Sequence, residues 1–327
     1  MEVTMNNENI LKRIWKIISK QKAVVAILIL LLIVLVSGQR GLFYNQRNLL
    51  GILRSAAIVE IVAFGVTVAV LCGGCDLSCG GVLSLSGIVC ILIINSGAPI
   101  IMGVLGALVC GMLIGFVNGF LVVHQKTEPF IITLGMGMLL KGVAQQLTDA
   151  HPLACKSDSF KNISNSTILG VPSLVVYMLI LLVLFYCLLR FTSYGRNCYA
   201  IGGNYDVAQY SGIPVVPIKW SAFVVSGFMA ALAGVLLASR MNTGNSVYGD
   251  DTGMLVNCGC VIGGTSFAGG QGGVIQSFIG LLVLQLLDNV MSTIGVDAYW
   301  QKLLTGVIIV IIIASDCFGR KLKRERV

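Results

Sequence analysis

Charged residues are scarce in this chain. Asp, Glu, Lys and Arg make up 11% of its 327 residues, whereas soluble domains carry about 25%. Hydrophobic residues make up 56%, and the mean hydropathy is +0.91. So few charges cannot cover the surface of a soluble protein of this size. The composition therefore excludes a soluble globular domain and predicts an all-α polytopic membrane protein.

The sequence also lacks the residue sets that carry chemistry. It has no Gly-x4-Gly-Lys-Ser/Thr phosphate loop, so we expect no ATP hydrolysis by this chain. Its two histidines, His124 and His151, are expected on opposite faces of the membrane, which excludes a Ser-His-Asp set. The 11 cysteines lie mostly in apolar runs, and Cys72, Cys75 and Cys79 have no second ligand pair nearby. We therefore expect no catalytic residues, no metal and no enzyme activity.

Basic residues give the chain a net charge of +8, but they cluster at its ends. Five precede the first apolar run, and five follow the last one. Short basic flanks of this kind are the positive-inside signal of membrane helices, and no nucleic-acid-binding module accompanies them. The pattern predicts cytoplasmic N- and C-termini and no nucleic-acid partner.

Ten apolar segments are candidates for membrane helices, since a spanning helix needs about 20 apolar residues. Residues 1–22 then form a basic cytoplasmic segment, 23–316 a single transmembrane domain and 317–327 a basic cytoplasmic tail. The first run has no cleavage site, so we interpret it as a retained helix. The segment 254–268 is short and glycine-rich, which favours a broken or re-entrant helix. The ten segments are 23–38, 50–72, 82–96, 99–123, 129–148, 173–191, 218–238, 254–268, 274–295 and 299–316.

Asp76 lies in a glycine-rich break, residues 73–81, between two of these segments. Irregular backbone at membrane depth survives only where protein or a water-filled cavity covers it. Polar residues in such places often mark the path of a molecule that crosses the membrane. A second glycine-rich break covers residues 263–273. Each break is interpreted either as part of such a path or as a tight packing turn.

Five motifs occur in a fixed order along the chain. Together they resemble the corresponding elements of the ribose/galactoside/xylose-type ABC sugar permeases, over about residues 48–316. The motifs are Gly-Gly-Cys-Asp-Leu-Ser at 73–78, Asn118-Gly119 with Pro-Phe-Ile-Ile-Thr-Leu-Gly at 129–135, Tyr-Gly-Arg-Asn-Cys-Tyr-Ala-Ile-Gly-Gly-Asn at 194–204 with Ser211-Gly212-Ile213, Ala233-Gly234, and Gly-Gly-Thr-Ser at 263–266 with Gly269-Gly270.

This resemblance implies a permease subunit of an ATP-binding-cassette importer in the inner membrane. Its cargo would be a monosaccharide, ribose or a related pentose or hexose, delivered by an extracytoplasmic sugar-binding protein. A cytoplasmic ABC ATPase would bind ATP-Mg, and this chain would bind no cofactor. A second permease chain, a copy or a paralogue, would complete the path within membrane lipid. The alternative is an ion-coupled secondary sugar transporter that acts alone, with Glu60 and Asp288 as acidic relay residues.

One region departs from the family pattern. Before the second glycine-rich break the family has an acidic residue and an aliphatic-Asp-Ala-Ile-Ala-Ala stretch, whereas residues 253–260 read Gly-Met-Leu-Val-Asn-Cys-Gly-Cys. Asp250 and Asp251 lie a few residues earlier. This departure leaves the identity of the sugar open.

The polar stretch 192–217 is the longest inner loop, and we interpret it as either an ordered loop or the contact with the ATPase. A short helix is expected after Asn204, with Asn204 as its N-cap and Gly212 as its end. The candidate coupling residues are Gly202, Gly203, Asn204, Asp206, Gln209, Tyr210, Ser211 and Gly212.

Glu60, Lys141 and Asp288 are expected about 18–21 Å above the cytoplasmic boundary. A lone buried charge is costly, so we expect Lys141 near Glu60 or Asp288. Such a pair would be structural, or it would line a sugar path. The candidate path residues, each also interpretable as a helix-packing contact, are Glu60, Asp76, Ser78, Asn118, Thr133, Lys141, Asn257, Thr265, Ser266, Gln285, Asp288 and Asn289.

Overall fold

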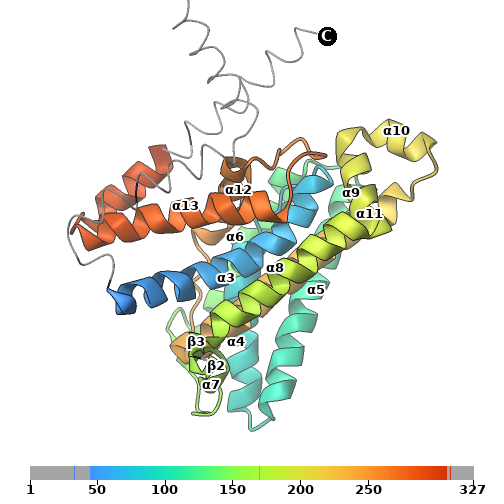
Figure 1. Ribbon diagram of the computed structural model, residues 1–327. Coiled ribbons are helices and arrows are strands. Elements are labelled where there is room, and N and C mark those ends of the chain that lie inside the picture. Colours follow the sequence, from blue (N-terminus) through green and yellow to red (C-terminus); the bar gives the residue numbers. More distant parts are fainter. Residues whose placement is uncertain (1–32, 34–44, 169, 308–309, 311–327) are drawn as a thin grey trace, which may run out of the picture.

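The computed structural model describes residues 33, 45–168, 170–307 and 310 of the chain (Figure 1). Helices dominate these residues, and six are long and apolar enough to cross a membrane. The chain is therefore a multi-pass membrane protein. The helices are α3 (Gln46–Leu71), α4 (Cys79–Asn95), α5 (Ile100–His124), α6 (Pro129–Thr148), α7 (Asn162–Asn165), α8 (Ser173–Phe191), α9 (Ser193–Gly203), α10 (Tyr205–Tyr210), α11 (Val215–Met241), α12 (Thr252–Gly263) and α13 (Val274–Thr293).

Two helices, α3 and α11, form the centre of the bundle. The apolar windows of α3 and α11 are 61% and 67% buried, whereas those of α5 and α6 are only 22% and 17% buried. The helix α11 packs against α3, α4 and α5, and α3 also packs against α8 and α13. The apolar outer faces of α5 and α6 carry many exposed large side chains, as expected for helices that contact lipid.

Glycines bring α5 and α11 into close contact. Gly111 and Gly115 are buried on the face of α5 that meets α11. A Cβ on Gly111 would touch the Gly227 carbonyl, and a Cβ on Gly115 would touch the Phe223 carbonyl. Small residues at this spacing let helix backbones approach each other within a membrane. The glycine content of the sequence thus serves, in part, the packing of the central helix.

The two ends of the bundle differ. Helices α9 and α10 lie at one end, and α7 lies at the other end with the strands β2 (Thr167–Ile168) and β3 (Val171–Pro172), which pair antiparallel (Figure 1). Strand β1 (Leu153–Ala154) pairs with β4 (Thr243–Gly244), which joins the loop after α6 to the end of α11. Each strand has two residues, too few for an alternating pattern to predict it.

Most of the predicted segments match helices within a few residues. The segment 254–268 is helical only as far as Gly263, and the 12 residues of α12 reach about 18 Å, less than the roughly 30 Å of a bilayer core. Residues 299–307 of the last predicted segment, 299–316, are helical. The first predicted helix lies outside the described residues except for residue 33, as do the two basic terminal segments. The helix count of ten and the cytoplasmic termini stay predictions.

Candidate functional site: the glycine-rich breaks and a polar cavity

Asp76 occupies the centre of the first break, in the non-helical segment between α3 and α4. Its side chain is 1% exposed, and both of its carboxylate oxygens accept hydrogen bonds. Oδ1 accepts from the backbone N–H of Ser78 at 3.0 Å and from the Ser78 hydroxyl at 2.6 Å. Oδ2 accepts from the Ser226 hydroxyl of α11 at 2.6 Å. The carboxylate therefore ties the break to the central helix.

Three further candidate residues complete a buried network around this segment. Asn118 of α5 donates to the Ser78 hydroxyl at 2.8 Å. Thr133 of α6 accepts from the Leu77 N–H at 3.1 Å. Asn257 of α12 donates to the Asp76 carbonyl at 2.8 Å. The structure thus brings five of the twelve candidate path residues together, from four segments of the chain: the first break, α5, α6 and α12.

In this structure the network is closed and holds the break in place. Asp76, Ser78, Asn118, Thr133 and Asn257 are all buried, and their polar groups mainly bond to one another and to nearby backbone. Asn118 Oδ1 is the exception, since it has no partner among the described residues. Such a network replaces the hydrogen bonds that the irregular backbone would lose in a membrane.

The second break packs against the first through backbone atoms. The Gly270 N–H donates to the Leu71 carbonyl at the end of α3, at 3.0 Å. Gly202, near the end of α9, approaches so closely that a Cβ there would touch both the Leu71 carbonyl and the Gly270 nitrogen. Gly269 has φ +87, a conformation that favours glycine, and a Cβ there would lie 2.8 Å from the Gly73 nitrogen. The second break and the end of α3, just before the first break, therefore meet the polar stretch 192–217 at Gly202.

The predicted short helix is present as α10, and its predicted boundaries are confirmed. The Asn204 side chain accepts from the Val207 N–H at 3.1 Å, which makes Asn204 the N-cap. Gly212 follows the helix with φ +78, and the Ile213 N–H returns to the Ala208 carbonyl. Tyr210 is 91% exposed, and the other candidate coupling residues, Asp206, Gln209 and Ser211, are exposed as well. The preceding helix α9 was not predicted.

Thr265 and Ser266 lie in the second break, away from Asp76. Thr265 is buried, its hydroxyl accepts from the Gly273 N–H at 3.2 Å, and it lies 3.1 Å from the Ser277 hydroxyl. The Ser266 hydroxyl accepts from the Ala268 N–H at 3.3 Å. Both side chains shape the loop between α12 and α13, and neither joins the Asp76 network in the described residues.

The prediction that Lys141 pairs with Glu60 or Asp288 was wrong. Lys141 Nζ instead lies 2.8 Å from Asp250 Oδ2, in the loop before α12, and the side chains are 41% and 35% exposed. Glu60 is fully buried in α3, and neither of its carboxylate oxygens has a partner among the described residues. Asp288 accepts from the Thr305 hydroxyl at 3.2 Å. The expected depth along each helix does not say toward which neighbour a side chain points.

Asp288, Gln285 and Asn289 line a polar cavity of about 770 Å³ between the start of α3 and the ends of α11 and α13. The start of α3 and the end of α13 lie side by side, far from α9 (Figure 1). Asn289 and Asn48 exchange amide hydrogen bonds of 3.1 and 2.9 Å across the cavity. The volume falls within the range of about 300–1,000 Å³ that is typical of ligand sites. Amide, hydroxyl and carboxyl groups of this kind suit a ligand rich in hydroxyls.

Several residues of these sites were missed in the sequence. Ser226 is one of three serines in the apolar helix α11, and nothing in the local pattern distinguishes it from the other two. Arg240 donates to the Ser55 hydroxyl at 3.4 Å and lines the polar cavity. Its charge at the end of an apolar segment was the signal that could have found it. Among the residues that the structure describes, no group of three or more His, Cys, Asp and Glu side chains could hold a metal ion.

Residues 48–313 match the BPD_transp_2 family, described as the branched-chain amino acid transport system / permease component. The ribose import permease protein RbsC of Haemophilus influenzae is 33% identical over 316 residues, which cover 95% of this chain and 97% of the relative. RbsC of Bacillus subtilis is 32% identical and covers 88% of this chain and 89% of the relative. The D-allose transport system permease protein AlsC of Escherichia coli is 32% identical, with 84% coverage of both. No solved structure matches the chain.

The chain belongs to this family of transport-system permease components, because the match extends over most of its length. Within that class it is a permease subunit of an ATP-binding-cassette importer, similar in sequence to sugar permeases along nearly the whole chain. It is accordingly a transport subunit and not an enzyme.

Proposed function

We propose that this chain forms the transmembrane path for a monosaccharide, ribose or a related pentose or hexose, in an ATP-binding-cassette importer. The names of the relatives, which import ribose and D-allose, support this cargo. The five ordered motifs support it as well. The observation that carries the coupling part of the proposal is the contact of Gly202 with Leu71 and Gly270.

In this proposal α9 and α10 are the part of the chain that receives the motion of an ATPase. The exposed Tyr205, Val207 and Tyr210 of α10 give a partner an apolar surface to hold. A displaced α9 would push on backbone at both glycine-rich breaks, because Gly202 leaves no space for a side chain there. Rigid-body movement of a short helix is a common way to transmit such a change.

The sugar path would run from the polar cavity toward the Asp76 network. Asp288, Gln285 and Asn289 would meet the hydroxyls of the sugar at one end. Asp76, Ser78, Asn118, Thr133 and Asn257 would separate when the break moves, and they would then offer replaceable hydrogen bonds. Thr265 and Ser266 would act through the second break. Glu60 and Lys141 would contribute through neighbouring helices, since neither lines the polar cavity.

The proposed setting is a bacterial inner membrane, with ten helices and both termini in the cytoplasm. The partners are a cytoplasmic ABC ATPase that binds ATP-Mg, an extracytoplasmic sugar-binding protein and a second permease chain, identical or paralogous. In this proposal the chain itself binds no cofactor. The apolar faces of α5 and α6 would contact membrane lipid or the second chain.

Reconstitution in proteoliposomes tests the proposal. We expect uptake of a labelled monosaccharide only when the ATPase, ATP-Mg and the binding protein are all present. Labelled leucine serves as the comparison substrate, because the family is described as a branched-chain amino acid transport component. Uptake of sugar by this chain alone under an ion gradient would support the ion-coupled alternative instead, and ATP-dependent uptake of leucine without sugar uptake would overturn the cargo.

A further inference from the structure

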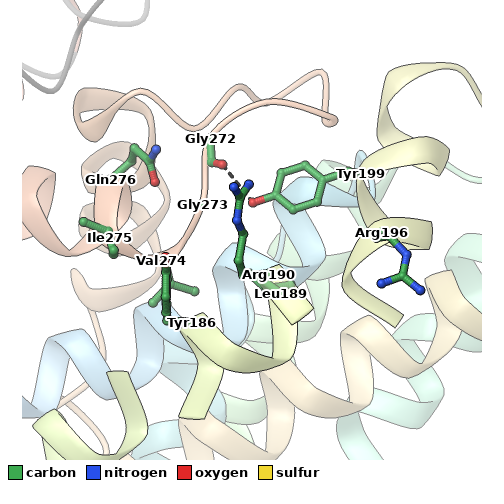
Figure 2. Close-up of a pocket in the computed structure, with 10 residues that line it drawn as sticks. All are labelled: Tyr186, Leu189, Arg190, Arg196, Tyr199, Gly272, Gly273, Val274, Ile275 and Gln276. Atoms are coloured by element: carbon green, nitrogen blue, oxygen red, sulfur yellow. Dashed lines mark hydrogen bonds between the residues drawn. The ribbon is translucent and has the colours of Figure 1, made fainter. Parts of the chain in front are cut away.

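A second cavity, the Arg190 pocket, lies where α8, α9 and the start of α13 meet (Figure 2). It measures about 330 Å³. The side chain of Arg190 extends toward Gly273 and Tyr199, whereas Arg196 points away from them (Figure 2). The residues that line it are Tyr186, Leu189, Arg190, Arg196, Tyr199, Gly272, Gly273, Val274, Ile275 and Gln276.

Among the residues that the structure describes, this pocket is lined by positive charge and has no counter-ion. Two arginines line it and no carboxylate does. Arg190 makes no ion pair with any residue that the structure describes, whereas Arg196 donates to the Ser193 hydroxyl at 2.8 Å. The Tyr199 hydroxyl donates to the Gly272 carbonyl at 2.9 Å, which fixes the ring beside Arg190 (Figure 2). Burial raises the pKa of Tyr199, and Arg190 opposes that rise, which agrees with their proximity.

Backbone donors add to the positive charge of the pocket. Helix α13 begins at Val274, and its N-cap Gly273 offers no side-chain hydrogen bond. The N–H groups of Val274, Ile275 and Gln276 have no acceptor among the described residues, since only the next one, Ser277, bonds back to the Gly273 carbonyl. The start of a helix carries about half a positive charge. A guanidinium beside such a start is a typical receptor for a phosphate group.

The position of the pocket indicates where that phosphate comes from. Arg190 lies in the last turn of α8, a candidate membrane span, so the pocket opens where hydrocarbon gives way to water. Leu189 and Val274 are buried beneath the charged groups, and Ile275 adds an exposed apolar side chain. The pocket therefore joins an apolar wall to a cationic rim, which matches the chemistry of a phospholipid.

We propose that the Arg190 pocket binds the phosphate group of an anionic phospholipid. The headgroup phosphate lies between the Arg190 guanidinium and the first N–H groups of α13. The acyl chains follow the apolar wall along α8. A lipid held there joins the α8–α9 corner to the start of α13, next to the second glycine-rich break. Basic pockets between membrane helices are known to hold anionic headgroups in this manner.

Native mass spectrometry of the delipidated full-length chain tests this proposal. The chain is titrated with short-chain phosphatidylglycerol, with phosphatidylcholine and with inorganic phosphate. We expect one tight phosphatidylglycerol, and we expect Arg190→Gln to weaken its binding about tenfold, since a charge-assisted hydrogen bond to phosphate is lost. Lys126→Gln is the matched control, because Lys126 follows α5, whose last residue His124 contacts Trp220 near the start of α11, and it is expected to leave that lipid bound.

A second variant separates binding from folding. Gln276→Glu places a carboxylate in the first turn of α13, where a negative charge favours the helix, and supplies the pocket with its own anion. It is expected to weaken phosphatidylglycerol binding with unchanged thermal stability. If the wild type binds inorganic phosphate tightly, Arg190→Gln removes that binding and lipid binding does not change, the pocket is an anion site but its ligand is not a phospholipid. That result would overturn the proposed lipid. Equal lipid and phosphate binding by the wild type and both variants would overturn the proposal.

Discussion

The backbone N–H of Gly270 donates a hydrogen bond of 3.0 Å to the carbonyl of Leu71. Gly270 belongs to the second glycine-rich break, and Leu71 is the last residue of α3, just before the first break, so the bond joins segments far apart in the sequence. Gly202 of α9 lies against the same carbonyl. In the proposed coupling, a movement of α9 would act directly on this backbone, because Gly202 lies against the Leu71 carbonyl and the Gly270 nitrogen without a side chain between them. This arrangement requires glycine at position 202. The contact can therefore be tested by a glycine-to-alanine substitution, which adds a single methyl group.

Gly202→Ala is expected to destabilise the chain and abolish ATP-dependent uptake. Its Cβ would collide with the Leu71 carbonyl and the Gly270 nitrogen, which are backbone atoms that cannot rotate away. Overpacking of this kind costs about 1–3 kcal/mol. Gly203→Ala is the matched control, because a Cβ there meets nothing within 4 Å. Thermal unfolding in detergent and uptake by the reconstituted importer measure both variants, and equal behaviour of the two would contradict the contact.

Ser226→Ala is expected to destabilise the chain by about 1–3 kcal/mol. It removes one donor from the buried Asp76 carboxylate and leaves Oδ2 without that partner. Asp76→Asn should be milder than Asp76→Leu, because the amide oxygen still accepts from Ser78. The free energy of unfolding is measured by denaturant titration in micelles. The exposed Ser166 gives the control Ser166→Ala, and the prediction fails if it costs as much as Ser226→Ala.

Gly115→Ala is expected to separate α5 from α11. The added Cβ would touch the Phe223 carbonyl and lie 2.9 Å from Cα of Val224. A cost of about 1–3 kcal/mol follows if the helices stay packed. Gly135→Ala in α6 changes the same residue type where nothing lies within 4 Å. Cross-linking between cysteines placed on α5 and α11 reports the separation, and unchanged cross-linking in Gly115→Ala would refute it.

The ion pair of Lys141 with Asp250 is expected to contribute little. Both side chains are more than a third exposed, and pairs of that kind are worth about 0–1 kcal/mol. Lys141→Met and Asp250→Asn should therefore each leave assembly intact, with a coupling energy below about 1 kcal/mol in a double-mutant cycle. The more exposed pair of Lys161 with Asp158 provides the reference cycle. A coupling energy of several kcal/mol would show that the site is far drier than the structure indicates.

Asp288→Asn is expected to lower sugar uptake by the reconstituted importer while the chain still folds. The variant keeps the shape of the side chain and an acceptor for the Thr305 hydroxyl, but it removes a charge from the polar cavity. A charged hydrogen bond to a ligand is worth about 1.5–3 kcal/mol, which corresponds to roughly tenfold or more in uptake efficiency. Asp297→Asn, outside the cavity lining, is the control. Normal uptake by Asp288→Asn would remove this cavity from the path.

The sequence predicts well whatever depends on hydropathy or on one capping residue. The long apolar runs identify α3, α5, α6, α8, α11 and α13, because each is long enough to cross a membrane. The N-cap at Asn204 and the end at Gly212 follow from local chemistry alone, since an amide caps free N–H groups and glycine adopts a positive φ. Five candidate path residues do share one network. The sequence does not predict which hydrogen-bond partners each of them has in that network.

What the sequence does not reveal is the direction in which each helix faces. Lys141 was expected near Glu60 or Asp288 on the basis of depth, yet the rotation of α6 presents it to Asp250. Ser226 supports Asp76 across 150 residues of sequence, and no local pattern marks such a pair. Helix α9 was missed because its polar residues resemble those of a loop, and its helical form depends on packing against α8, α10 and α11.

The central position of α11 has a consequence for biosynthesis. Helices α3, α4 and α5 leave the ribosome well before α11, which is their shared packing partner. Until Ser226 is translated, the Asp76 carboxylate lacks the hydroxyl that holds it in the bundle. The contacts of α3, α4 and α5 with α11, and the hydrogen bond of Asp76 to Ser226, can therefore form only after the second half of the chain has been synthesised.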